Sequence, residues 1–159
     1  MKKILPLFLF SILIQFQING QGIFDASIHT AIPIGDVNSP FNEGPDQIID
    51  QDPTTKFLDF NIVDGMAFEV DLLGVPKIAS SIQIVTANDA PERDPTMYEI
   101  FGSTDSITFT SIATGELPCV SERFLSRTFG FTNSTPYTCL LYTSPSPRDA
   151  TLSRMPSSA

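Results

Sequence analysis

A period-two alternation of apolar and polar residues is the feature that most constrains the fold of this chain. In the stretch MAFEVDL, from Met66 to Leu72, apolar residues alternate with two carboxylates. Successive side chains of a β-strand point to opposite faces, so this pattern predicts a strand with one buried face. Similar short stretches recur along the chain between loops rich in Pro, Gly, Asn and Asp, and no long segment has helical periodicity. The sequence therefore predicts an all-β sandwich or barrel.

The expected strands can be placed by this alternation and by the turn residues between them. Two of them form a hairpin around residues 104–106, and one helical turn is expected over residues 46–50. The predicted strands cover residues 23–32, 55–60, 66–72, 78–87, 97–103, 107–113 and 123–131.

The N-terminus has the pattern of a secretory signal peptide. Lys2 and Lys3 precede the apolar run ILPLFLFSILI (Ile4–Ile14), after which the sequence becomes polar. That run is shorter than the ~20 residues that a membrane-spanning helix needs. The sequence therefore predicts that residues 1–21 are removed, and that the mature chain is exported without a membrane span. A secreted or cell-surface protein of bacterial type is expected.

The C-terminal stretch CLLYTSPSPRDATLSRMPSSA, from Cys139 to Ala159, fits neither a strand nor a helix pattern. A Pro- and Ser-rich linker is one interpretation. Another is that residues 139–159 resemble the translation of a transposase-type sequencing adapter. On that hypothesis they are an artefactual, disordered tail. The domain then covers residues 22–138 and is truncated before its last strand, and Cys119 is either a buried free thiol or has lost its partner.

The charge of the expected domain narrows the class of ligand. The whole chain has 18 acidic and 9 basic residues, and four of the basic ones, Lys2, Lys3, Arg148 and Arg154, lie outside residues 22–138. With 17 acidic and 5 basic residues, the domain has a net charge of −12. Such a surface repels phosphate backbones, so no nucleic-acid partner is expected. Hard cations such as calcium, and neutral ligands such as sugars, are compatible with it.

Three stretches in a fixed order carry a resemblance to a known superfamily. They are NEGPDQIIDQDPTTKF (residues 42–57), GMAFEVDL (residues 65–72) and IVTANDAPERDPTMYEIFGSTDS (residues 84–106), followed by ITFTSI. Together they resemble the discoidin-like, galactose-binding-like domains, which include coagulation-factor type C domains and a family of carbohydrate-binding modules. The resemblance covers most of residues 23–138 and implies a jelly-roll β-sandwich. Gln51 stands where the family usually has Gly, and Phe57 where it has Trp.

The resemblance implies a structural calcium ion at the stretch DQDPTTKF. Asp50, Asp52 and Thr55 are the candidate ligands, with backbone carbonyls completing a shell of ~6–8 oxygens. The alternative is an Asx-type turn in which carboxylates and hydroxyls bond to the local backbone without a metal.

The resemblance also places sugar-binding loops at one end of the sandwich. In NDAPERDP, Arg93 with Asp89 or Asp94 could clamp sugar hydroxyls, or the same residues could form an internal network that makes the loop rigid. Phe41, beside Asn42, could be an exposed aromatic platform or a plug over the core.

No catalytic constellation is present in the sequence. His29 is its single histidine and lies in an expected strand, where a structural role is favoured. We therefore expect a secreted, non-enzymatic binding module for carbohydrate or a cell-surface glycan. Two alternatives stay open: an accessory domain of a larger secreted enzyme such as a glycoside hydrolase, and a structural or adhesive cell-surface domain with a protein partner.

Overall fold

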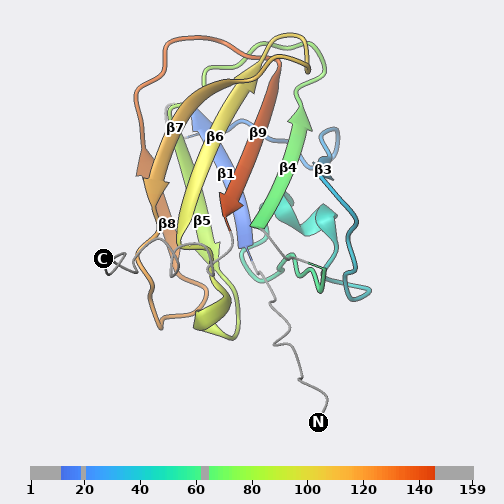
Figure 1. Ribbon diagram of the computed structural model, residues 1–159, viewed down its shortest axis with the longest axis vertical. Helices are drawn as coiled ribbons and strands as arrows, with labels where there is room; N and C mark the ends of the chain where they lie inside the picture. Colours follow the sequence, from blue (N-terminus) through green and yellow to red (C-terminus); the bar gives the residue numbers. More distant parts are fainter. Residues whose placement is uncertain (1–11, 19–20, 62–64, 146–159) are drawn as a thin grey trace, which may run out of the picture.

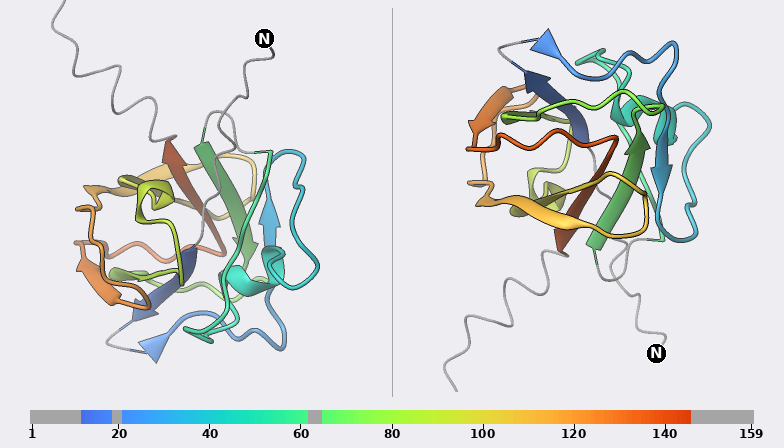
Figure 2. Two further views of the ribbon diagram at one scale, coloured as in Figure 1. Left: turned by 90° about the horizontal axis from the view of Figure 1, so that it is seen from below. Right: turned by 90° about the horizontal axis from the view of Figure 1, so that it is seen from above.

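The computed structural model describes residues 12–18, 21–61 and 65–145. The strands are β1 (Ile12–Ile18), β2 (Gln21–Gly22), β3 (Ala31–Pro33), β4 (Gly65–Asp71), β5 (Ser81–Thr86), β6 (Met97–Ser103), β7 (Thr110–Glu116), β8 (Ser126–Gly130) and β9 (Cys139–Pro145), with 3-10 helices η1 (Pro45–Ile48) and η2 (Pro91–Arg93). They form a four-stranded sheet of order β2-β1-β5-β8 and a five-stranded sheet of order β3-β4-β9-β6-β7 (Figures 1 and 2). The predicted all-β sandwich is confirmed.

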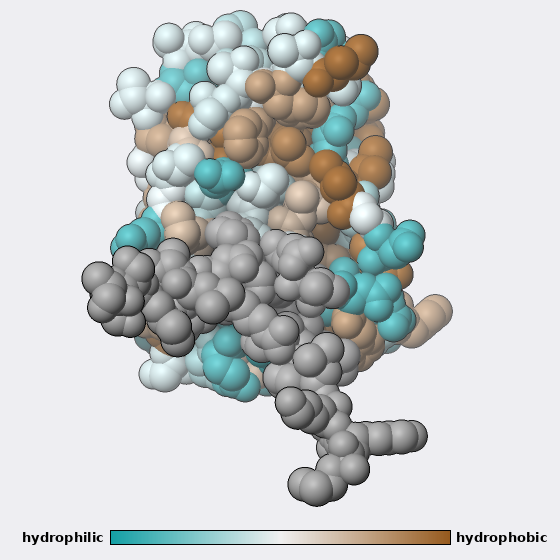
Figure 3. Space-filling model, viewed as in Figure 1, coloured by the Kyte–Doolittle hydropathy of each residue, from teal (hydrophilic) through white to brown (hydrophobic). Residues whose placement is uncertain are grey.

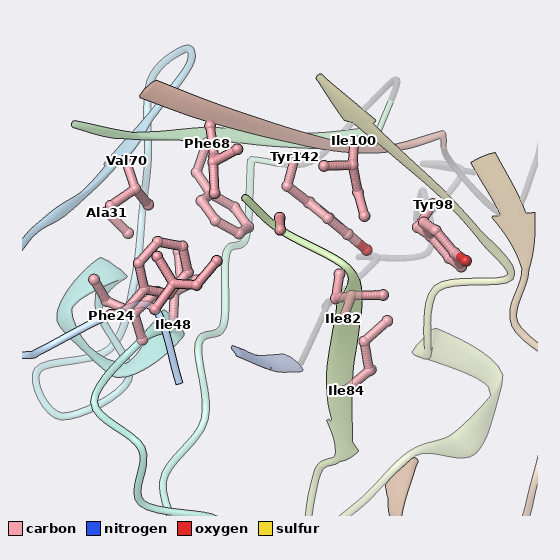
Figure 4. Packing of buried hydrophobic residues seen from close by; sticks show 14 of the residues in the cluster. Phe24, Ala31, Ile48, Phe68, Val70, Ile82, Ile84, Tyr98, Ile100 and Tyr142 are labelled. Carbon is pink, nitrogen blue, oxygen red and sulfur yellow. The ribbon is translucent and has the colours of Figure 1, made fainter. Parts of the chain in front are cut away.

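One apolar core lies between the two sheets (Figure 4). Phe68 of β4 and Tyr142 of β9 stack with ring centroids 5.1 Å apart. Ile82 of β5 and Ile100 of β6 are also fully buried. Burial of each large apolar side chain contributes about 1.5–3 kcal/mol, so residues at alternate strand positions hold the sheets together. The inward face of β4 is the one that the alternation of MAFEVDL predicts.

Most of the predicted elements have counterparts in the structure. The strands expected at 66–72, 78–87 and 123–131 correspond to β4, β5 and β8, and the expected hairpin corresponds to β6 and β7. The expected helical turn is η1. The expected strand at 55–60 is an extended segment in which Phe57 alone forms a bridge.

The first predicted strand, over Ile23–Ile32, is wrong for most of its length. The chain turns at Asp25, because the side chain of Asp25 accepts hydrogen bonds from the backbone N–H and the hydroxyl of Ser27. Its backbone carbonyl accepts the N–H of His29 at 2.8 Å, and the ring Nδ1 of His29 accepts the N–H of Asp25. Aspartate favours such local turns. Only the short strand β3 remains, at the end of the predicted range.

Strand β1 lies inside the segment predicted to be a removable signal peptide. It pairs antiparallel with β5 from Ile12 opposite Thr86 to Gln17 opposite Ser81, and with β2 on its other side. Removal of residues 1–21 stays a prediction, but it would take this strand out of the sheet. No helix in the described part of the chain has the length and hydrophobicity to span a membrane.

Strand β9 corrects the expectation that the chain is disordered from Cys139 onward. It lies between β4 and β6, with Phe68 opposite Tyr142 and Ile100 also opposite Tyr142. Leu140 and Tyr142 are buried, whereas Leu141 and Thr143 are partly exposed. This period-two alternation fits a strand with one buried face. In the sequence it is short, and the Pro- and Ser-rich residues that follow it are typical of a linker.

The outer surface of the five-stranded sheet is of mixed hydropathy. Apolar side chains gather towards its β3 edge, on the right in Figure 3. Ile32 and Ile34 are more than half exposed there. The edge strand β3 has only three residues, which limits its capacity to pair with another chain.

Candidate functional site

Two loops that are far apart in sequence meet at one end of the sandwich. One runs from β3 to β4 and contains η1, and the other joins β5 to β6 and contains η2 (Figure 1). Lys56 of the first loop joins them. Its Nζ lies 2.8 Å from Oδ1 of Asn88, 3.3 Å from Oδ2 of Asp89 and 3.6 Å from Oε1 of Glu43. Its side chain is only 12% exposed, so the amine is held in place by these acceptors.

Asp89 is the shared acceptor of this site. Its second oxygen, Oδ1, lies 3.3 Å from Nη2 of Arg93, so one carboxylate is flanked by two cations. The side chain of Asp89 is nevertheless 47% exposed. We call Glu43, Lys56, Asn88, Asp89 and Arg93 the loop cluster. Its two carboxylates balance its two cations, so it carries no net charge although the protein is strongly acidic.

Asp94 belongs to a different network, which fixes the shape of the η2 loop. Nη1 and Nη2 of Arg123 donate to its two oxygens at 3.0 and 2.7 Å. The guanidinium also donates to the carbonyls of Asp89 and Val120. Hydrogen bonding to Asp94 raises the pKa of Arg123. Planar guanidinium–carboxylate pairs of this kind are geometrically specific, so the loop is clamped to the segment before β8.

The predicted binding residues therefore separate into three groups. Asp89 and Arg93 come together in the loop cluster. Asp94 is buried against Arg123, so it is not available to clamp a sugar hydroxyl. Its partner in the internal network is Arg123, not Arg93. Phe41 and Asn42 lie at the tip of a turn in which the N–H of Glu43 donates to the carbonyl of Pro40. The five predicted binding residues are thus Phe41, Asn42, Asp89, Arg93 and Asp94.

The aromatic side chain at that turn is fully exposed. Phe41 has 100% of its accessible surface in solvent, so it is not a plug over the core. Its turn is tied to the sheet end because the N–H of Leu58 donates to the carbonyl of Glu43 at 2.9 Å. The ring lies two residues before Glu43, on the same loop that contributes Glu43 and Lys56 to the loop cluster.

Sequence analysis missed several residues of this end of the molecule. Glu43, Lys56 and Asn88 have no distinctive local motif, and Arg123 lies 29 residues from Asp94. The excess of acidic residues was the available signal, because the few cations of such a chain are expected to be paired. It does not say which acid pairs with which base.

The predicted calcium ligands form a hydrogen-bonded turn. Oδ1 of Asp50 accepts the N–H of Asp52, and its Oδ2 accepts the hydroxyl of Thr55. Oδ1 of Asp52 accepts the N–H and the hydroxyl of Thr54, and this bonding lowers the pKa of Asp52. Both oxygens of Asp50 and one of Asp52 are thus acceptors already. Within residues 12–18, 21–61 and 65–145, no group of three or more His, Cys, Asp or Glu side chains is arranged to hold a metal ion. Calcium binding here stays a prediction.

The same turn contains Gln51, which stands where the resembling family usually has Gly. Its φ of 64° lies in the left-handed region, which favours glycine. The side-chain Nε2 donates to the carbonyl of Phe24 at 2.6 Å. This hydrogen bond anchors the turn to the segment before β3 and offsets part of the conformational cost.

Comparison with known proteins gives a consistent result for the fold. No protein-family model and no curated protein matches the chain. Several solved structures do, among them a family 32 carbohydrate-binding module from Clostridium perfringens in complex with GalNAc-β-1,3-galactose. The two are 20% identical with a TM-score of 0.61, over 75% of this chain and 85% of that one.

Two further modules from Clostridium perfringens are similar. One comes from a family 31 glycoside hydrolase, with 18% identity and a TM-score of 0.55 over 76% of this chain and 80% of that one. The other is the family 32 module of NanJ in complex with galactose, with 22% identity and a TM-score of 0.53 over 74% and 88%. The resemblance in the sequence motifs is therefore confirmed at the level of the fold. This chain has the galactose-binding-like β-sandwich of the family 32 carbohydrate-binding modules.

Proposed function

We propose that this protein is a non-catalytic module that binds a neutral carbohydrate at the loop cluster. The observation that carries the proposal is the carboxylate of Asp89, which Lys56 and Arg93 flank at the loop end of the fold. Sugar hydroxyls both donate and accept hydrogen bonds. An exposed carboxylate between two held cations offers acceptors and donors within one small area.

The structural neighbours support the same class of ligand. Two of the similar structures contain a bound saccharide, GalNAc-β-1,3-galactose in one and galactose in the other. The exposed ring of Phe41 adds an apolar surface on which the C–H face of a sugar could pack.

Electrostatics favours a neutral ligand over an anionic one. The loop cluster is balanced, and the chain around it has twice as many acidic as basic residues. A uronic or sialic acid would approach against this field, whereas a neutral hexose would not.

The role of the single histidine supports a binding function without catalysis. His29 accepts the N–H of Asp25 through Nδ1, at 2.9 Å, and thereby stabilises the turn before β3.

We propose that the protein acts outside the cell, on the basis of the signal-peptide pattern. A second candidate role is that of an accessory domain in a larger secreted enzyme, because one similar structure is a module of a family 31 glycoside hydrolase.

The test is calorimetric titration of the full chain with galactose and with GalNAc-β-1,3-galactose. Asp89→Asn and Arg93→Ala should each weaken binding about tenfold, which is the loss of about 1.4 kcal/mol expected for one hydrogen bond to a charged group. Phe41→Ala should weaken it as well. Ile107→Ala is the matched control, because that residue is 84% exposed in the β6–β7 turn, outside the loop cluster. Equal affinity of all four variants and the parent would overturn the assignment of the site.

A further inference from the structure

A pocket lies beside the start of β4, and none of the loop cluster residues is in its lining. It has a volume of about 220 Å³. Within the described part of the chain, four segments line it: the end of β3 with the residues after it, η1, the extended segment from Phe57 to Asn61, and the first residues of β4. Its lining includes Asp36, Ile48, Phe57, Asp59, Asn61 and Met66.

Asp59 gives this pocket a specific chemistry. The residue is only 6% exposed and yet contributes to the pocket wall. One oxygen, Oδ1, accepts the backbone N–H groups of Asn38 and Asn61, both at 2.9 Å. No donor among the described residues contacts its other oxygen. A carboxylate oxygen accepts hydrogen bonds, so a donor that enters from the pocket can bond to this second oxygen.

The wall that carries Asp59 is held in place by the backbone. The N–H of Phe60 donates to the carbonyl of Asn38 at 2.9 Å, beside the bond from the N–H of Asn38 to Asp59. The carboxylate is thus oriented before any ligand arrives. Preorganised acceptors of this kind lower the cost of ordering on binding.

The rest of the lining defines the ligand class. The floor is apolar, with Ile48, Phe57 and Met66, and the described wall contains Asp36 as a second carboxylate but no Lys, Arg or His. A ligand must therefore combine hydrogen-bond donors with an apolar body and must not be an anion. A pyranose ring meets these conditions, because hydroxyl or ammonium groups can donate to Asp59 while C–H groups contact the floor.

A shallower hollow of about 400 Å³ continues from this pocket across the end of the five-stranded sheet. The two share Ile34, Gly65, Met66 and Ala67 in their linings, and the second extends to Glu99. The two hollows are therefore adjacent, and the second also has an acidic residue in its wall.

We propose that the Asp59 pocket is a second saccharide site, which takes one neutral or amine-bearing sugar unit and excludes carboxylated sugars. The neighbouring hollow receives the next unit of an oligosaccharide. This inference rests on the proposed function, but it concerns residues separate from the loop cluster, so the two can be distinguished.

The test uses backbone amide NMR shifts of the full chain during titration with methyl β-galactoside, glucosamine and glucuronic acid. The first two should shift the amides of Gly35, Asn61 and Gly65, and glucuronic acid should not. Asp59→Asn keeps the acceptor for the two backbone N–H groups but replaces the open oxygen with a donor. Asp59→Asn should raise the dissociation constant obtained from these amide shifts at least tenfold. Arg93→Ala and Ile107→Ala should leave that dissociation constant unchanged.

A steric variant keeps the proposal testable if Asp59→Asn fails to fold. Ala67→Leu adds volume where the two hollows join, at a position that is only half-buried, and should also abolish the shifts. Shifts confined to Glu43, Lys56 and Asn88 would overturn this inference and leave the proposed function standing. Absence of shifts anywhere with every saccharide would overturn both.

Discussion

Gly102 lies directly against the aromatic ring of Tyr137. A Cβ atom added to this glycine would meet the ring at a distance that real contacts do not reach. Gly102 is in β6, and Tyr137 forms an isolated bridge with Lys77 just before β9. The glycine of the sequence stretch YEIFGS is thus explained by the close approach of a tyrosine 35 residues later in the chain.

Gly102→Ala should lower the free energy of unfolding by about 1–3 kcal/mol, the usual cost of overpacking. Tyr137 is 9% exposed and has backbone hydrogen bonds to Lys77 in both directions, so it cannot move aside freely. Urea denaturation followed by circular dichroism measures the change. Gly130→Ala is the control, because no atom lies within 4 Å of the added Cβ in that strand. Equal stabilities of the two variants would contradict the packing account.

The clamp between Arg123 and Asp94 should matter more than the ion pair between Arg93 and Asp89. Arg123→Met removes a guanidinium that donates to Asp94 and leaves a carboxylate that is 7% exposed without its partner. We expect a loss of about 1–3 kcal/mol and faster proteolysis of the η2 loop. Arg93→Met removes a pair whose carboxylate is half exposed, and it should cost about 0–1 kcal/mol.

Differential scanning calorimetry and limited proteolysis measure these two effects. Arg123→Lys is a further comparison, because lysine keeps the charge but lacks the planar fork that bonds both oxygens of Asp94. Full rescue by lysine would show that charge alone, and not the fork geometry, holds the loop.

The sequence predicts the strands of this fold far better than it predicts the contacts of the site. Strands β4 to β8 follow from alternation and turn residues because these signals are local. The Asp25 turn overrode the strand pattern of residues 23–32 because a side chain competed with the sheet for backbone hydrogen bonds. The pairing of Asp94 with Arg123 depends on how two loops come together in space. No local pattern contains that information.

The carboxyl group of Asp105 should have a pKa well below the ordinary range for aspartate. Backbone N–H groups of Thr108 and Ile107 and the hydroxyl of Ser103 donate to it, and they lower its pKa to about 2. Because the folded pKa is depressed, the stabilisation is present above the unfolded pKa of about 3.9 and is lost as the pH falls towards 2. NMR titration of the carboxyl carbon measures the value directly. Asp105→Asn should remove this part of the acid sensitivity, and a folded pKa near 3.8 would show that the turn does not hold the carboxylate.

Removal of the N-terminal segment tests whether β1 is a permanent part of the sheet. Without Ile12–Ile18, strand β5 loses one hydrogen-bonded neighbour and keeps only β8. The sequence of β5 is SIQIVT, which has no charged residue, proline or glycine. Exposed edges of this composition pair with other chains, because charge and proline are the usual protection against such pairing. A chain that begins at Gly22 should therefore form oligomers, whereas the full chain should be monomeric by light scattering.

A charged residue at the new edge is the control for this interpretation. Gln83→Lys in the shortened chain places a cation in the middle of β5, and it should shift the oligomers back towards monomer. If the shortened chain is itself monomeric and has the same melting temperature as the full chain, β1 does not stabilise the sheet. Residues 1–21 can then be removed without loss of stability. Intact mass measurement of the exported protein then connects the two results, because it shows directly whether residues 1–21 remain on the folded chain.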